Sequence, residues 1–128
     1  PHVGRNLHPG ACEAARAAVC AQWAGRFSEM HDALFGAQGK LMAGAGRDSL
    51  LALGEEVGLS APTLAACLAD ASSLAQLGRD IDEGRALGVP GTPAWVLNGR
   101  PLFGALTRGA HSPVDLVRSV IKAGLWQD

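Results

Sequence analysis

The segment from Gly88 to Arg100 limits the fold of this chain more than any other part of the sequence. It reads Gly-Val-Pro-Gly-Thr-Pro, then Ala-Trp-Val-Leu, then Asn-Gly-Arg. Proline lacks a backbone N–H and fixes φ, so the first part cannot continue a helix. The apolar run that follows ends at an Asn-Gly pair, which is a strong signal for a β-hairpin. We therefore expect a turn carrying the Thr92–Pro93 step, followed by hairpin strands at residues 95–97 and 102–103.

Most of the chain before this segment is expected to be helical. Alanine has the highest helix propensity and proline suits a first helical turn, so the alanine-rich stretch after Pro9 predicts a helix. A glycine-rich connection is expected over residues 36–46. In the helix before it, four apolar residues are spaced to share one face: Phe27, Met30, Leu34 and Phe35. The predicted helices cover residues 9–24, 26–35, 47–57, 60–69, 72–87 and, after the hairpin, 112–124.

Composition excludes several classes of function. A chain of 128 residues has room for one domain with a modest core. A net charge of −1 with 18% charged residues gives no electrostatic basis for binding nucleic acid or a membrane surface. No apolar run is long enough for a transmembrane span, and no signal peptide is visible. Because the chain begins at Pro1, we expect it to be a processed product, an excised domain or a truncated sequence.

The residues offer no metal or cofactor site. The four histidines, His2, His8, His31 and His111, are scattered, and no two have the i, i+4 spacing of a helical metal pair. The glycine-rich segments lack the lysine and the strand context of a phosphate-binding loop. We therefore expect neither a metal ion nor a cofactor.

The three cysteines do not form a redox centre that can be read from their spacing. Disulfide exchange requires a thiolate of lowered pKa and a resolving thiol close by. The cysteines are Cys12, Cys20 and Cys67, and no Cys-x-x-Cys occurs in the chain. Cys12 and Cys20 are separated by about 12 Å along one predicted helix, which is too far for a disulfide. Cys12, near the helix start, is expected to be a half-exposed structural thiol.

Three motifs, in order and spacing, resemble the DsbA-like thiol-disulfide oxidoreductases of the thioredoxin superfamily. They are His8-Pro9-Gly10-Ala11, the stretch Phe-Ser-Glu-Met-His-Asp-Ala-Leu-Phe at 27–35, and the stretch at 81–93 that ends in Gly-Val-Pro-Gly-Thr-Pro. The resemblance covers about residues 7–124. It implies an α/β fold, mostly helical in this chain: an incomplete thioredoxin-like fold with an inserted helical subdomain, a C-terminal β-hairpin and a closing helix. Residues 1–128 then form one partial domain.

Within that domain, the resemblance implies a helical insertion and bridging helix over 9–88. It places the cis-proline loop, the hairpin and the C-terminal helix in 89–128. The Thr92–Pro93 bond would be cis and, with Gly91, would hold an extended protein or peptide substrate by strand addition. An ordinary turn with Pro93 at a strand edge is the alternative.

Related proteins often carry cysteines at the places of Cys20 and Cys67, so the resemblance implies a structural disulfide between them. Two buried free thiols are the alternative. A disulfide would indicate an oxidising compartment. A periplasmic or other extracytoplasmic location of a bacterial-type parent protein follows from the same resemblance.

The resemblance implies disulfide exchange with exported proteins in the intact parent, and redox inactivity of these 128 residues because Cys-x-x-Cys is absent. A non-catalytic peptide- or protein-binding module of the thioredoxin fold is the alternative. A glutathione-transferase or isomerase relative of the same fold is a third reading. Because a two-stranded hairpin leaves edges and faces open, we also expect a homo-oligomer or a partner that completes the sheet.

Overall fold

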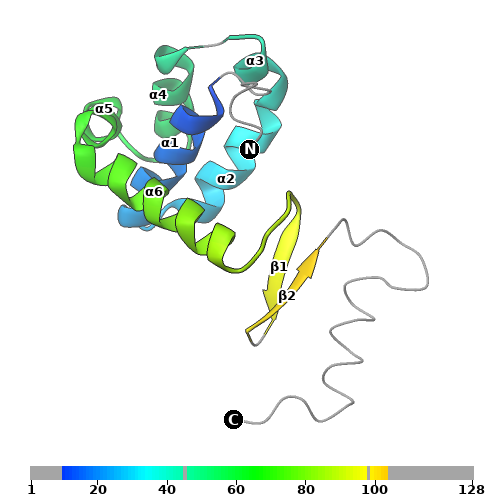
Figure 1. The fold of residues 1–128 in the computed structure, drawn as a ribbon. Coiled ribbons are helices and arrows are strands. Elements are labelled where there is room, and N and C mark those ends of the chain that lie inside the picture. The colour runs from blue at the N-terminus through cyan, green and yellow to red at the C-terminus, as the bar shows by residue number, and fades with distance from the viewer. Residues whose placement is uncertain (1–9, 45, 98, 104–128) are drawn as a thin grey trace. The chain divides into compact units, whose positions relative to one another are not determined.

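The computed structural model describes residues 10–44, 46–97 and 99–103 (Figure 1). The chain divides into two compact units, residues 1–80 and 81–128. The predicted helix at 112–124 lies outside the described residues. In the described part, no helix is both long and apolar enough to cross a membrane.

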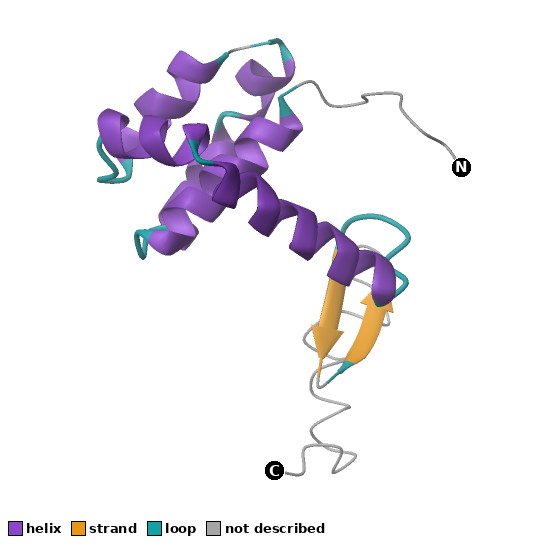
Figure 2. Cartoon of the chain, turned by 60° about the vertical axis from the view of Figure 1, so that its left-hand side comes forward, coloured by secondary structure: helices purple, strands orange, loops and turns teal. Residues whose placement is uncertain are grey.

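Six helices precede a two-stranded antiparallel sheet in the described residues (Figures 1 and 2). This order confirms the mostly helical α/β architecture expected from the sequence. The elements are α1 (Ala11–Trp23), α2 (Phe27–Gly36), α3 (Gln38–Met42), α4 (Arg47–Glu56), α5 (Ala61–Ala69), α6 (Ala71–Ala86), β1 (Ala94–Leu97) and β2 (Arg100–Phe103).

The prediction of a connection without a helix over residues 36–46 is wrong, because α3 lies within it. The local sequence is a poor helix former, since Gly39 is in the middle of the helix. Leu41 of α3 is buried and belongs to the hydrophobic core. Burial of this side chain is a tertiary effect that overrides weak local propensity.

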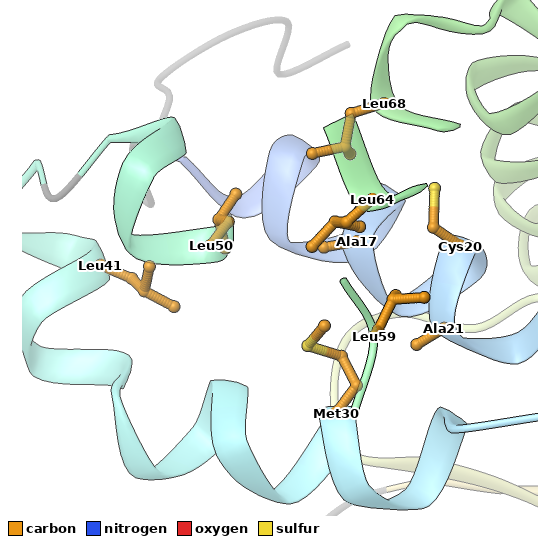
Figure 3. Packing of buried hydrophobic residues seen from close by; sticks show 9 residues of the cluster. All are labelled: Ala17, Cys20, Ala21, Met30, Leu41, Leu50, Leu59, Leu64 and Leu68. Atoms are coloured by element: carbon orange, nitrogen blue, oxygen red, sulfur yellow. The ribbon is translucent and has the colours of Figure 1, made fainter. Parts of the chain in front are cut away.

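The core of the first unit is built from small residues on α1 and larger ones on the helices around it (Figure 3). Ala17 and Ala21 are fully buried one turn apart on α1, so neighbouring helices can approach it closely. The larger members fill the space between the helices. The cluster consists of Ala17, Cys20, Ala21, Met30, Leu41, Leu50, Leu59, Leu64 and Leu68.

Helix α2 does not place its four apolar residues on one buried face. Met30 is fully buried and Leu34 packs against the core, but Phe27 and Phe35 are 46% and 64% exposed. Phe27, His31 and Phe35 recur every four residues, and their ring centroids lie 6.0 Å and 4.7 Å apart. The core covers Met30 and Leu34 but not Phe27 and Phe35, so the expected single face separates into a buried part and an exposed aromatic part.

In the second unit, β1 and β2 form the hairpin that the Asn98-Gly99 pair predicts. The strands are antiparallel, with Ala94 opposite Phe103 and Leu97 opposite Arg100. Trp95 and Val96 are each 50% exposed among the described residues. Successive side chains of a strand lie on opposite faces, so each face of the sheet carries an exposed apolar residue.

Asp70 links two helices, because it follows the last residue of α5 and precedes the first residue of α6. Its Oδ1 accepts a hydrogen bond of 2.8 Å from the backbone N–H of Ser72. This bond satisfies one of the free N–H groups of the first turn of α6, as an N-cap does. Hydrogen bonds from the backbone and then the side chain of Ser72 lower the pKa of Asp70.

A close approach of α4 to α5 depends on Gly54 of α4. A Cβ atom placed there would lie 2.7 Å from Leu64 Cδ2 and 3.2 Å from the carbonyl oxygen of Leu59. Both leucines are buried in the core, so neither has free space into which to move. Only glycine fits this position without a shift of α4 or α5.

We expect Gly54→Ala to destabilise the protein by about 1–3 kcal/mol, because overpacking outweighs the better helix propensity of alanine. Gly78→Ala in α6 is the matched control, since nothing lies within 4 Å of its added Cβ. The control should be neutral or stabilise by up to about 1 kcal/mol. Urea unfolding followed by far-ultraviolet circular dichroism measures both. Equal effects of the two substitutions would contradict the close approach.

Acid should weaken the start of α6. The pKa of Asp70 is lowered in the folded state, so its ionised form contributes stability at neutral pH. This contribution is lost as the pH falls below about 4, through the ordinary range of an aspartate and towards the lowered pKa. Asp70→Asn keeps a capping oxygen but does not titrate, so its stability difference from wild type should shrink between pH 5 and pH 3. Thermal unfolding at both pH values tests this, and a difference independent of pH would contradict it.

Candidate functional site

The loop between α6 and β1 contains the residues expected to bind substrate. Helix α6 ends where Gly88 adopts a left-handed conformation, with φ of 70°. The N–H of Gly88 bonds to the carbonyl of Arg85, and the N–H of Val89 to that of Gly84, each at 3.0 Å. This is the Schellman arrangement, for which glycine is the favoured residue. It ends the helix and directs the chain into the loop.

Gly91, Thr92 and Pro93 are exposed in this loop, and the Thr92–Pro93 peptide bond is cis. Among the described residues, no backbone hydrogen bond uses the N–H or carbonyl group of Gly91 or Thr92. Strand β1 begins at the next residue, and within the described part it pairs with β2 along one edge. Within the described part of the chain, the loop therefore leaves these backbone groups unpaired beside the end of a strand, which suits an extended peptide.

Cys20 and Cys67 form a disulfide that joins α1 to α5, with a Cα–Cα distance of 6.0 Å and a sequence separation of 47. The pair that the resemblance implied is thus bonded, and the alternative of two free thiols is wrong. Cys20 is 3% exposed, and Cys67 packs against the core. Burial and the connection of two core helices point to a structural bond.

Cys12 is the free cysteine, and it is exposed. It lies in the first turn of α1. The other two cysteines are bonded to each other. No resolving thiol therefore remains for Cys12 within the chain, and the described residues contain no nucleophile–resolver pair.

No metal centre is present in the described part of the chain, where no three potential ligands among His, Cys, Asp and Glu come together. His31 is exposed, and its Nδ1 lies 3.1 Å from Oδ1 of the neighbouring Asp32. The other three histidines, His2, His8 and His111, lie outside the described residues.

Comparison with known proteins gives one family match and two partial relatives. The model of the family described as DSBA-like thioredoxin domain matches residues 3–113. The chain is 35% identical over 100 residues to a protein of Salinispora arenicola named Na(+)/H(+) antiporter NhaA 1, covering 78% of this chain and 15% of that protein. It is also 35% identical over 95 residues to Na(+)/H(+) antiporter NhaA 3 of Salinispora tropica, covering 74% and 14%. No solved structure matches.

The chain thus spans about one seventh of the length of the curated relatives that it matches.

The sequence and the family resemblance together predicted the loop and both bonded cysteines. It did not find the exposed aromatic face of α2, whose signal was present as the four-residue spacing of Phe27, His31 and Phe35.

Removing the disulfide should lower stability without changing the fold. The double variant Cys20→Ala, Cys67→Ala opens a long loop in the unfolded chain, which costs about 2–4 kcal/mol of unfolding free energy. Cys12→Ala is the matched control, because its exposed side chain makes the change neutral within about 0.5 kcal/mol. Urea unfolding of oxidised samples measures both, and equal stability of the double variant and wild type would contradict a structural role.

Proposed function

Because the chain belongs to the family of DSBA-like thioredoxin domains, we propose that it docks extended protein substrates at Gly91, Thr92 and Pro93 for thiol–disulfide exchange. The family is one of thiol-disulfide oxidoreductase-like proteins. The chain contributes the substrate loop and the helical subdomain. Exchange itself requires a nucleophilic and a resolving thiol.

The observation that carries this proposal is the exposed loop with its free backbone groups. A peptide that binds by strand addition uses backbone N–H and carbonyl groups, and its side chains add specificity. The free groups of Thr92 suit such pairing with many sequences, because every peptide has the same backbone. A substrate class of unfolded or partly folded proteins follows.

The 128 residues alone are proposed to be inactive towards dithiols. The support comes from the cysteines: Cys20 and Cys67 are bonded to each other in the core, and Cys12 has no second thiol with which to complete exchange. Any catalytic pair would therefore come from another segment of a longer polypeptide or from a partner chain.

The antiport named for the two Salinispora proteins is not extended to this chain. The similarity involves only 15% and 14% of those proteins, whereas the family match covers residues 3–113 here.

We place the domain in an oxidising, extracytoplasmic compartment. The support is the Cys20–Cys67 disulfide, since such bonds persist mainly outside the reducing cytosol.

A non-catalytic binding module is the second candidate function, and the absence of Cys-x-x-Cys from the 128 residues favours it. The exposed Trp95 and Val96 on a two-stranded sheet support a further interaction, either with a second copy or with a sheet-completing partner. Sedimentation equilibrium of the purified chain tests the homo-oligomer, and a monomer at micromolar concentration would exclude it.

Thr92→Pro should weaken peptide binding about five- to tenfold, because it removes one backbone N–H donor from the loop. Thr92→Val is the matched control: it changes the side chain but keeps the backbone groups, so affinity should stay within about twofold. The probe is reduced, carboxymethylated insulin B chain, which cannot take part in exchange. Isothermal titration calorimetry measures binding, and circular dichroism checks that each variant is folded.

No binding to the wild-type chain, or equal affinity of Thr92→Pro and wild type, would contradict docking at this loop. An insulin-reduction assay with dithiothreitol separates the question of chemistry from that of docking. We expect turnover no faster than the dithiothreitol background. Faster turnover would contradict redox inactivity. It would not affect the test of docking at the loop, which depends on the binding measurement alone.

A further inference from the structure

Arg16 connects α1 to the corner where α5 ends and α6 begins. Its Nη2 donates to the carbonyl oxygens of Leu68 and, at 3.2 Å, Asp70. Its Nε and Nη2 lie 3.2 Å and 2.9 Å from the hydroxyl oxygen of Ser73. One guanidinium therefore reaches the last turn of α5, the linking residue and the first turn of α6.

The acceptors at this corner need a partner. The last carbonyl groups of a helix have no partner within it, and α5 has no basic residue in its last turn. Arg16 places a cation there from another helix, where the helix dipole favours positive charge. Ser73 is fully buried, and its hydroxyl lies 2.9 Å from the carbonyl oxygens of both Cys67 and Asp70. Without Arg16, several buried or part-buried polar groups would lose a partner.

The same corner is also held by the disulfide. Cys20 lies four residues after Arg16, hence on the same side of α1, and Cys67 immediately precedes Leu68 on α5. Two attachments therefore join one face of α1 to the end of α5. The disulfide is covalent but can be reduced, whereas the bonds of Arg16 do not depend on the thiol state.

We propose that Arg16 is a latch that keeps the α5–α6 corner closed when the Cys20–Cys67 disulfide is reduced. Reduction by a dithiol breaks the S–S bond, and two electrons and two protons pass to the cysteines. The dithiol becomes a cyclic disulfide. The end of α5 and the start of α6 then remain attached to α1 through Arg16. The helical unit therefore keeps its structure whether the cysteines are oxidised or reduced. The latch depends on the fork of donors in a guanidinium, which lysine does not reproduce.

Hydrogen–deuterium exchange of the full chain tests this proposal, with and without dithiothreitol. The measured quantity is the exchange rate of residues 66–74 relative to that of α2, residues 27–36, in the same sample. On reduction, wild type should change this ratio by less than about threefold. Arg16→Met keeps the aliphatic stem but removes the donors, so reduction should raise the ratio by about tenfold or more, because local opening becomes accessible.

Arg47→Met is the matched control. Arg47 of α4 also donates to a carbonyl oxygen of α5, that of Ala65 at 2.9 Å, but it does not reach the corner. Reduction of this variant should leave the ratio as in wild type. A tenfold rise in Arg47→Met would show a general weakening of α5 and would overturn the proposal.

Two further outcomes would overturn the latch: a tenfold rise on reduction of wild type, or no greater rise in Arg16→Met than in wild type. If reduced Arg16→Met unfolds throughout, as shown by equal loss of protection in residues 27–36, Arg16→Lys is measured instead. Lysine keeps the charge but offers fewer directed donors. An intermediate rise is expected for it, and a ratio equal to that of wild type would overturn the proposal.

Discussion

Helix α1 is the element against which the first unit is assembled, and its attachment to α5 is the constraint on which the packing depends. Ala17 and Ala21 bury without side-chain bulk, so α1 can be approached closely by its neighbours. The disulfide at Cys20 closes a separation of 47 residues, which limits the unfolded chain more than a short bridge would. Gly54 permits a comparably close approach of α4 to Leu64 of α5. Close packing at small residues and one disulfide thus hold this core together without large aromatic side chains.

Polar groups at the helix ends determine where the chain turns. Asp70 Oδ1 accepts a hydrogen bond from the backbone N–H of Ser72, and Arg16 donates to a carbonyl oxygen at the end of α5. At the other end of α6, Gly88 allows the left-handed turn that leads to the Thr92–Pro93 loop. Each of these residues satisfies backbone groups that would otherwise lose water without gaining a partner. The Thr92–Pro93 loop therefore follows a helix whose two ends are both defined by hydrogen bonds.

Peptide docking and disulfide exchange place different demands on a chain of the DSBA-like thioredoxin domain family, to which this chain belongs. The docking that we propose needs exposed residues, and Gly91 and Thr92 are exposed. Exchange needs two thiols in reach of each other, and the only bonded pair here holds core helices together. Cys20 is buried and Cys67 is partly buried against the core, so the pair joins helices rather than facing a substrate. The cysteine pair of this chain therefore contributes to stability, and the described residues contain no second pair of cysteines for exchange.

The sequence by itself determined five of the six described helices, the hairpin and the position of the loop, because their signals are local. Ser60 and Pro62 mark the start of α5, Gly88 marks the end of α6, and Asn98-Gly99 marks the hairpin. The pairing of Cys20 with Cys67 came from family resemblance, since spacing alone left it open. Only the tertiary structure decided that Leu41 stabilises a helix across Gly39, that α2 exposes Phe27 and Phe35, and that Arg16 reaches Ser73. Which side chains the core covers in each case depends on residues distant in the chain, and local sequence signals do not specify such contacts.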